Sequence, residues 1–473
     1  MKQYIVKNLI LGEFRESYSK ERIFVEDILE NKSIISMPNS IEADLADAFL
    51  AANQVEDELK EFPIKDIIQI IKKVGKNYLN DEEKIKLIAA TTGSPISYVK
   101  SSLASIKEWM QNIDLFIETV FGSIENLENG VPVISKNKEI SRIFYKPGGI
   151  TSIILAGDEV ALSTYVITQA ILSRNPIVVK PSTIELISSY ELIQEFAKNG
   201  LKDFIQMVCW NSQIRPDLVR NLISGGKQVV LFGNDNTVNS FIYERDNGNI
   251  VKDYSQGRKI IRFTSGRSTA IVMEDSDTKL AIKEIIYGAT MNRGIECINT
   301  KKVYVHEKVY DSFLKIVKQE AKNLKVGKPL DKNTDISYID RKNLQDIKSL
   351  SNESNIISGS FSKDYMTLLI VEDETNNSRF VREEIPGPVL AFVKIKSIND
   401  AITKANNALG EGSFVTSTSL FTKNKGYIRR AALNLKTHKL NVNKSSTFMD
   451  FLVMHDGKYL LKSLLDEKIL SVY

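Results

Sequence analysis

Cys297 is the residue of this sequence whose type and place best suit nucleophilic chemistry. It lies where an apolar helical pattern gives way to a strand pattern, directly after Arg293-Gly294-Ile295-Glu296. Two lysines, Lys301 and Lys302, follow four and five residues later. A thiol at such a junction, with cations close by, is expected to be exposed and partly ionised, and a thiolate is the form that attacks carbon. A lone cysteine more often belongs to the core, so the assignment depends on the rest of the chain.

Lys180 and Gly233 end two apolar segments in positions that suit a bound nucleotide. Lys180 is followed by a proline, Ser182 and Thr183, and its ammonium would project from the carboxyl end of a strand. Gly233 and Asn234 stand at the start of a predicted helix, where free N–H groups and the positive dipole end attract pyrophosphate. Taken singly, such segments are more often an ordinary strand-end lysine and a plain βα turn. The chain has no Gly-x-Gly-x-x-Gly segment, which argues against the usual dinucleotide fold.

The elements that must position these residues are strands that alternate with helices from Ile150 onward. Five apolar strands predict a parallel, doubly wound sheet, and ligands bind such sheets at the carboxyl ends of the strands. A second series of strands predicts a second α/β lobe, with a boundary near Phe263 to Arg267 and the active site between the lobes. The first series comprises Ser152 to Leu155, Pro176 to Val179, Phe204 to Cys209, Lys227 to Phe232 and Lys259 to Phe263, and the second comprises Thr269 to Met273, Lys301 to Val305, Met366 to Val371 and Val389 to Lys394.

The first third of the chain carries mainly helical patterns. Apolar residues recur with a period near 3.6 from Ile64 to Val74. A second amphipathic stretch runs from Ile96 to Met110, with Ser94 expected as its N-cap. The apolar faces of both stretches are expected to pack in the core. The polar segment from Ser351 to Lys363 predicts a surface loop.

Taken in order, these segments resemble the aldehyde dehydrogenase superfamily from about Arg142 to Asn443. Gly294-x-x-Cys297, followed by a basic-Val-Tyr-Val strand, is similar to the nucleophile segment of that family. The resemblance implies an α/β fold of two doubly wound lobes, one cofactor-binding and one catalytic, with an N-terminal helical region and an oligomerisation β-segment. The expected parts are residues 1–125 as the mainly helical part of the cofactor-binding lobe, 126–146 as an oligomerisation hairpin, 147–262 as the NAD(P)-binding lobe, 263–443 as the catalytic lobe, and 444–473 as a C-terminal segment with an oligomerisation strand.

The resemblance places Lys180, Ser182 and Thr183 at the adenosine ribose of a dinucleotide. Members of the family that are restricted to NAD often carry glutamate where this chain has Thr183. A neutral hydroxyl there tolerates a 2′-phosphate, which Lys180 can contact. We therefore expect NADPH as the cofactor, with NAD as the alternative.

Four further residues correspond to functional positions of the family. Gly233 and Asn234 match the glycine segment at the pyrophosphate, and Glu384 matches the glutamate that binds the nicotinamide ribose. Asp158 stands where the family has the asparagine that donates to the oxyanion. An ionised carboxylate cannot donate, so either the N–H of Cys297 does so or Asp158 is protonated. The structural alternative for Asp158 is a helix N-cap.

Phe263 indicates the type of reaction. It stands where the family has the glutamate that activates water to hydrolyse the acyl-enzyme. Without that base, a thioester at Cys297 would exchange with another thiol, which favours an acyl-CoA reductase. Within the superfamily the chain resembles the LuxC-like acyl-CoA reductases of bacterial bioluminescence, in Gly157-Asp158 and around Phe263. The expected reaction is therefore NADPH-dependent reduction of a fatty acyl-CoA or another acyl thioester to the aldehyde. Two alternatives stay open: an aldehyde-oxidising enzyme whose base is Glu296, and an inactive protein that kept the fold.

The composition excludes several other classes of function. Of the 473 residues 26% are charged, and because the net charge is only +4, no basic surface for nucleic acid is predicted. Two cysteines form no disulfide framework, and three scattered histidines indicate no metal site. No apolar stretch approaches the ~20 residues that span a bilayer. We expect a cytoplasmic protein.

The expected partners are small molecules and further copies of the chain. The resemblance implies an acyl-CoA or acyl-carrier substrate, with an acyl-transferring enzyme as a partner. The segments Leu127 to Tyr145 and Lys468 to Tyr473 look like strands. In the family such segments pair between subunits, which predicts a homodimer or homotetramer.

Overall fold

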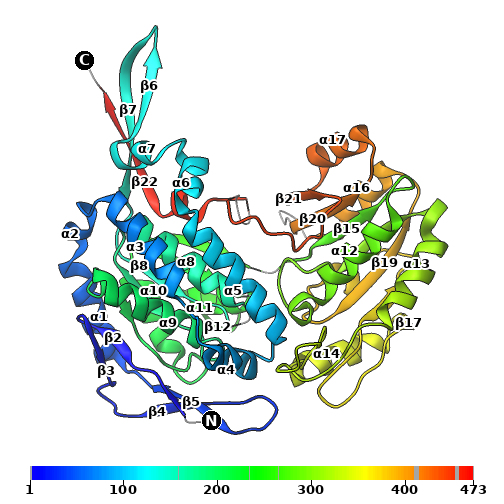
Figure 1. Cartoon of the computed structure of the whole chain (residues 1–473), viewed down its shortest axis with the longest axis horizontal. Coiled ribbons are helices and arrows are strands. Elements are labelled where there is room, and N and C mark those ends of the chain that lie inside the picture. The colour runs from blue at the N-terminus through cyan, green and yellow to red at the C-terminus, as the bar shows by residue number, and fades with distance from the viewer. Residues whose placement is uncertain are drawn as a thin grey trace.

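The computed structural model describes residues 3–157, 159–233, 235–264, 266–409, 415–452 and 457–471. Two α/β lobes, each built around its own sheet, face one another (Figure 1). A third, smaller sheet projects from the first lobe. The predicted fold class, two doubly wound α/β lobes, is confirmed.

The sheet of the first lobe has seven strands in the order β14-β11-β8-β9-β10-β2-β3. The five strands from β14 to β10 are parallel, as the sequence predicts, and the runs of β8, β9, β10 and β11 are buried on both faces. β2 and β3 add an antiparallel edge that the sequence analysis missed. The bounds are β2 Asn8–Ile10, β3 Glu13–Arg15, β8 Thr151–Ile154, β9 Ile177–Lys180, β10 Ile205–Met207, β11 Gln228–Phe232 and β14 Lys259–Phe263.

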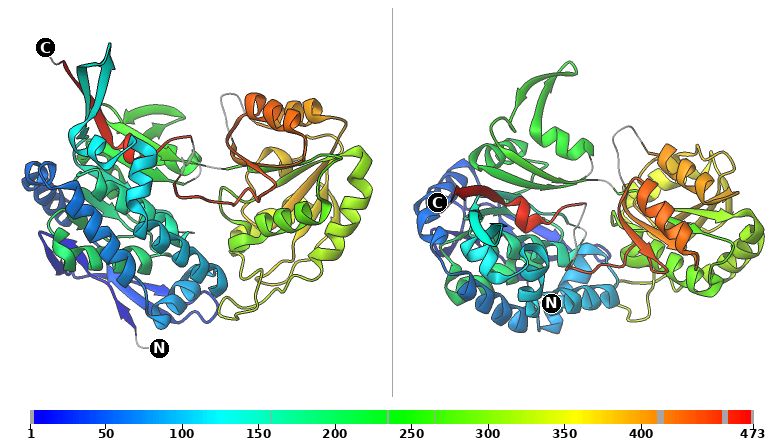
Figure 2. Two further views of the ribbon diagram at one scale, coloured as in Figure 1. Left: turned by 45° about the horizontal axis from the view of Figure 1, so that its top comes forward. Right: turned by 90° about the horizontal axis from the view of Figure 1, so that it is seen from above.

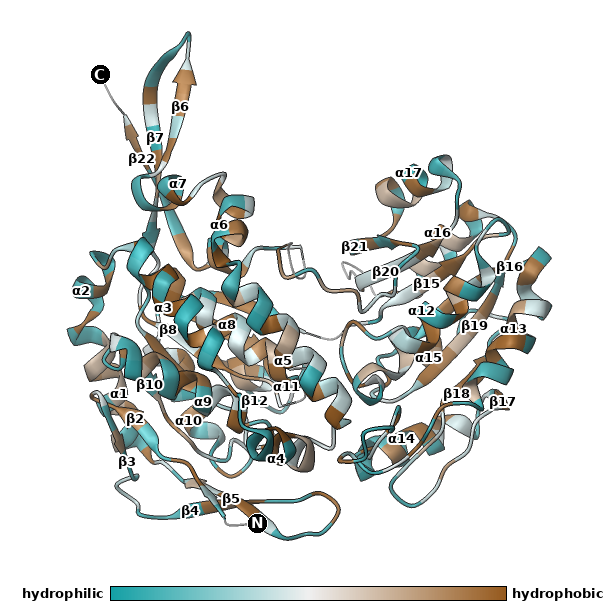
Figure 3. Ribbon diagram, viewed as in Figure 1, coloured by the Kyte–Doolittle hydropathy of each residue, from teal (hydrophilic) through white to brown (hydrophobic). Residues whose placement is uncertain are grey.

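Helices cover both faces of this sheet. The larger core lies under four helices, and Figure 3 shows polar residues on the outer side of α3 and α5. A smaller core lies under α1 and α10 on the other face. The bounds are α1 Glu42–Gln54, α3 Ile64–Asn77, α5 Ile96–Gln111, α8 Val160–Leu172, α9 Ile187–Phe196 and α10 Pro216–Gly225. Both helices predicted in the first third are therefore present.

The N-terminal region is less helical than predicted. Besides β2 and β3, it forms a three-stranded sheet of β1 (Tyr4–Ile5), β5 (Ser33–Pro38) and β4 (Arg22–Glu26). The cap expected at Ser94 is wrong, since Pro95 is the N-cap residue of α5 and no side chain caps it. Proline suits that place because it has no N–H to satisfy.

The second lobe has a seven-stranded sheet in the order β17-β18-β19-β16-β15-β20-β21. Every pair except β17–β18 is parallel. The short strand β17 occupies part of the segment predicted to be a loop. The bounds are β15 Thr269–Val272, β16 Lys302–His306, β17 Asn355–Ser358, β18 Leu369–Glu372, β19 Val389–Ile395, β20 Val415–Phe421 and β21 Thr437–Val442.

The third sheet pairs the C-terminal strand with a long hairpin. β22 (Leu465–Ser471) lies antiparallel to β7 (Lys138–Pro147), which pairs with β6 (Val131–Ser135). Figures 1 and 2 show this sheet standing away from both lobes. Several apolar side chains on it are exposed, namely Ile134, Ile140, Ile469 and Leu470.

Candidate active site

The lobes enclose a cleft of about 970 Å³ that gathers most of the predicted site residues. The first lobe lines it from the carboxyl ends of β8, β9, β11 and β14, the usual ligand-binding edge of a parallel sheet. The second lobe lines it from segments that precede β15, β16 and β19, which are neighbours in the sheet. Because these three strands begin side by side at the cleft, the segments before them converge there. The lining residues include Lys180, Ser182, Thr183, Gly233, Phe263, Glu296, Cys297 and Glu384.

Cys297 lies half-buried in this cleft, at the end of a turn with an unusual backbone. The three consecutive residues Asn292, Arg293 and Gly294 have positive φ angles of 44°, 64° and 69°. Such conformations are costly for residues other than glycine and persist only where surrounding contacts fix them. Arg293 provides two of these contacts, because its guanidinium donates to the backbone carbonyls of Thr92 (2.8 Å) and Tyr338 (3.2 Å).

The backbone of Cys297 is held from behind by the segment before β15. Gly266 approaches it so closely that a Cβ on Gly266 would lie 2.7 Å from the Cα of Cys297. The Ser268 hydroxyl donates to the Cys297 carbonyl at 3.1 Å. The position of the thiol is therefore determined by contacts with a second segment as well as by its own turn.

Glu296, next to the thiol, is a buried carboxyl in the same cleft. It accepts a hydrogen bond from Asn292 Nδ2 at 2.9 Å and a second from the Tyr98 hydroxyl. Burial, together with Glu296 and Glu159, raises the pKa of Tyr98 well above its usual value, so Tyr98 stays a neutral donor. The sequence analysis had no signal for Tyr98, which comes from α5 in the first lobe.

Phe263 forms an apolar wall of the cleft. Its ring stacks on that of Phe232, with centroids 4.7 Å apart and planes 5° from parallel. The two residues pair in register on β14 and β11, which explains the stacking. The place that the resemblance assigns to a water-activating carboxyl is thus filled by two packed rings.

Lys180 offers a cation to the cleft from the first lobe. It ends β9, and burial lowers its pKa to about 8. Its ammonium lies 5.9 Å from the Trp210 ring, and none of the carboxyls that the structure describes forms an ion pair with it. Beside it, Ser182 Oγ accepts from the N–H groups of Ile184 (3.1 Å) and Glu185 (3.4 Å). Lys180 is therefore available to a ligand, whereas Ser182 also holds its own turn.

Gly233 occupies a conformation that requires glycine. Its φ is +145°, and its N–H donates to the Phe263 carbonyl at 3.2 Å. Helix α11 (Asp235–Ile242) begins two residues later, and Asn236 and Thr237 of its first turn also line the cleft. The predicted site residues Asn234 and Asp158 lie outside the described residues.

Glu384 comes to the cleft on the segment before β19. Its carboxylate accepts a hydrogen bond from the Gly266 N–H at 3.3 Å. Pro386 also lines the cleft. Glu384 and Cys297 thus both contact Gly266, although 87 residues separate them in the sequence.

The two lysines after Cys297, expected to be cations close to the thiol, are drawn into the interior. Both are buried, and burial lowers the pKa of each to about 7. Lys301 donates to the carbonyls of Gly294 and Gly387. Lys302 has no hydrogen-bond partner within the described part of the chain. Their closeness to Cys297 in the sequence did not predict these contacts, because tertiary packing determines where the two side chains lie.

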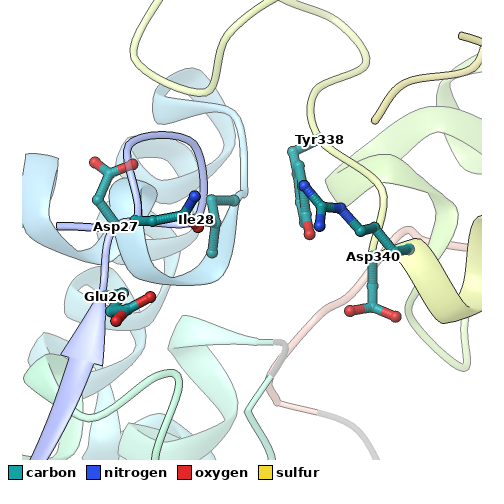
Figure 4. A pocket seen from close by; sticks show the side chains of 7 residues that line it. Glu26, Asp27, Ile28, Tyr338 and Asp340 are labelled. Atoms are coloured by element: carbon teal, nitrogen blue, oxygen red, sulfur yellow. The ribbon is translucent and has the colours of Figure 1, made fainter. Parts of the chain in front are cut away.

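The turn between β4 and β5 and the loop before α14 (Arg341–Ser351) face each other beside the cleft. A smaller cavity of about 260 Å³ lies there. Figure 4 shows Glu26, Asp27 and Ile28 facing Tyr338 and Asp340 across it. Glu26 and Asp340 also line the main cleft, so both cavities share carboxylates.

Two searches of the described residues gave negative results. No helix there is long and apolar enough to cross a membrane. Nor do three or more His, Cys, Asp or Glu side chains come together in those ranges as they would around a metal ion.

Comparison with known proteins identifies a family. The profile of the "Aldehyde dehydrogenase family" matches residues 14–457. A 1-pyrroline-5-carboxylate dehydrogenase of Bacillus licheniformis is 27% identical over 352 residues, which cover 70% of this chain and 65% of that protein. A lactaldehyde dehydrogenase of Methanococcus maripaludis is 27% identical over 80% of this chain and 79% of its own length. The match thus spans less than two thirds of the Bacillus relative.

Solved structures agree on the fold. An aldehyde dehydrogenase from Bartonella henselae superposes with a TM-score of 0.86 at 18% identity, covering all of both chains. A 3,6-anhydro-L-galactose dehydrogenase in complex with NAP gives a TM-score of 0.82 at 19% identity, covering 99% of this chain and all of the other. The predicted superfamily is confirmed. The expected closeness to acyl-CoA reductases has no support from these proteins and stays a prediction.

Proposed function

This chain belongs to the aldehyde dehydrogenase family, and on that premise we propose that it oxidises an aldehyde to the carboxylic acid with NAD(P)+. The observation that carries the proposal is the common cleft, which is lined by the Cys297 nucleophile, the cation Lys180 and the buried carboxyl Glu296. An oxidation of this kind needs a nucleophile, a hydride acceptor and a base for water.

The chemistry assigned to the protein residues has two stages. The Cys297 thiolate attacks the aldehyde carbon, and the C–S bond forms as the carbonyl oxygen becomes an oxyanion. A bound NAD(P)+ supplies the hydride acceptor, which leaves a thioester at Cys297. Water then adds to the thioester carbon while Glu296 takes its proton, and the C–S bond breaks to release the acid and the thiolate.

The residues present fit a dinucleotide. The cleft volume lies within the range of ordinary ligand sites. Lys180 would hold the adenosine ribose, the Gly233 turn with the start of α11 would hold the pyrophosphate, and Glu384 would hold the nicotinamide ribose. A Cβ at Gly157 would lie 2.5 Å from Ser182 Oγ, so this position favours glycine. Without a side chain there, a ligand can lie directly across the backbone.

For the choice between the two cofactors we propose NADP+ over NAD+. Thr183 places no carboxylate beside Lys180, and a 2′-phosphate would gain a charge-assisted contact with the ammonium. The solved structure that holds NAP shows that this fold accommodates such a ligand in another protein.

The second candidate function is NADPH-dependent reduction of an acyl thioester. The stacked rings of Phe263 and Phe232 favour it, because they exclude the usual base and make the acyl-enzyme resistant to water. The carboxylates of Glu26 and Asp340 in the lining of the cleft oppose it, because CoA is a polyanion. An acyl-transferring partner enzyme would be needed only under this second candidate. Under either candidate, we propose that the exposed third sheet pairs with a second copy of the chain.

The test measures both directions at 340 nm. A panel of aldehydes with NAD+ or NADP+ and a panel of acyl-CoAs with NADPH are run with the wild type, Cys297→Ser and Cys209→Ser. Cys209 is a matched control, since it is buried and burial raises its pKa to about 12. Aldehyde-dependent reduction that only Cys297→Ser abolishes supports the proposal. Turnover with acyl-CoA alone, accompanied by free thiol, would select the second candidate.

A further inference from the structure

The ammonium of Lys301 lies between two loops that carry site residues. Its Nζ donates to the Gly387 carbonyl at 2.7 Å and to the Gly294 carbonyl, and the residue is 2% exposed. Gly294 precedes Cys297 by three residues, and Gly387 follows Glu384 by three. One buried amine therefore joins the nucleophile segment to the segment of the proposed ribose-binding carboxylate.

The two loops are in backbone contact at this point. Gly294 has a φ of +69°, and a Cβ there would lie 2.5 Å from the Gly387 carbonyl oxygen. No side chain fits between the loops. The distance between their backbones therefore depends on a group that forms hydrogen bonds to both. Two carbonyl dipoles that converge on one point repel each other unless a donor stands between them. Lys301 is that donor.

We propose that Lys301 is a positioning residue that locks the Cys297 loop to the Glu384 loop and so fixes the distance between nucleophile and cofactor. The inference rests on the proposed function. Lys301 bonds the two carbonyls and acts through them on Cys297 and Glu384.

Lys302 shows that burial of an amine alone does not produce this arrangement. It is the next residue, is equally buried, and makes no hydrogen bond within the described ranges. Both lysines lose ammonium character on burial, but at Lys301 the nearby carboxylates of Glu384 and Glu296 oppose that loss. The chain thus contains its own matched control, with the same side chain and burial at the adjacent position.

Removal of the donor predicts a specific defect. In Lys301→Met both carbonyls lose their partner, and the loops are free to move apart. Since Cys297 and Glu384 are each three residues from the clamp, a shift of about 1 Å reaches both, and such a shift costs about 10²-fold in rate. The affinity for the cofactor and the reactivity of the thiol fall together, which links two groups on different loops.

The experiment compares Lys301→Met, Lys301→Arg and Lys302→Met. The rate of Cys297 alkylation by iodoacetamide and the Kd for NADP+, followed by quenching of tryptophan fluorescence, are measured beside kcat and KM. We expect Lys301→Met to slow alkylation and turnover by about 10- to 100-fold and to weaken NADP+ binding. Lys301→Arg, which keeps a charged donor, recovers most of both, and Lys302→Met stays within about two-fold of the wild type.

Two outcomes would overturn the inference. One is Lys302→Met with the same defects as Lys301→Met, which would reduce the effect to loss of a buried amine. The other is Lys301→Met with wild-type alkylation and NADP+ affinity. If Lys301→Met does not fold, Lys301→Gln takes its place and is judged by the same two readouts. Neither the alkylation rate nor the Kd for NADP+ needs aldehyde turnover. A protein without the proposed activity can therefore still confirm or refute the role of Lys301.

Discussion

Replacement of Gly266 by alanine tests whether backbone contact places the nucleophile. The added Cβ would lie 2.5 Å from the Cys297 carbonyl carbon and 2.7 Å from its Cα, whereas ordinary contacts begin at 3.4 Å. The two segments must therefore separate by about 1 Å, and a misplacement of that size costs about 10²-fold in rate. The Glu384 carboxylate would move with its partner, the Gly266 N–H.

Three measurements check this expectation. For Gly266→Ala we expect kcat/KM and the iodoacetamide alkylation rate to fall by about 10²-fold. A thermal melt shows whether the fold survives. Gly426→Ala, in α17 (Lys425–Asn434), is the matched control, because its nearest neighbour would be the Asn424 side-chain oxygen at 3.1 Å. Wild-type alkylation and turnover in Gly266→Ala would refute the claim that this contact fixes the thiol.

Three further predictions concern titratable groups. Glu296→Gln should keep the first burst of NAD(P)H formation but slow the steady-state turnover rate by about 10²- to 10⁴-fold, because only hydrolysis of the acyl-enzyme loses its base. An equal fall in the burst rate and the steady-state rate would contradict this role. The pKa of Lys180 is about 8, so its ammonium is lost as pH rises through that value and NADP+ affinity should fall between pH 7 and 9. Lys180→Met should bind NADP+ about 10- to 100-fold more weakly at pH 7, and persistence of the pH dependence in this variant would exclude Lys180 as its source. Because the pKa of Lys302 falls from 10.5 to about 7 on folding, the unfolded chain binds more protons in that interval and stability should rise with pH there. In thermal melts, Lys302→Met should reduce the rise of stability with pH. It should also stabilise the protein by about 1–3 kcal/mol at pH 7, because a buried amine without a partner is removed. A destabilised variant would show instead that the amine has a partner.

The parallel strands were predictable because a strand buried on both faces gives an unbroken apolar run. Ile177–Lys180 and Gln228–Phe232 follow this rule and lead directly to Lys180 and Gly233. The strands depend on local pattern, which the sequence states directly. The place of Cys297 in the cleft followed only from the motifs on both sides of it, because a lone cysteine is more often part of the core.

The parts that could not be predicted depend on tertiary contacts or on short polar strands. The hairpin of β12 (Tyr243–Asp246) and β13 (Asn249–Asp253) is exposed and carries no apolar run. The burial of Lys301 depends on the carbonyls of two distant glycines, and charged side chains are ordinarily expected at the surface. The role of Tyr98 depends on a helix that meets Glu296 only after the lobes fold.

The most direct test of the account is capture of the acyl-enzyme. The protein is mixed with an aldehyde and NADP+, quenched within the first turnover, digested and analysed by mass spectrometry. The account predicts an acyl adduct on the Cys297 peptide, in amounts that match the burst of NADPH, and neither adduct nor burst in Cys297→Ser. Aldehyde oxidation by Cys297→Ser, or turnover of the wild type with no adduct on Cys297, would contradict the assignment of this thiol as the nucleophile.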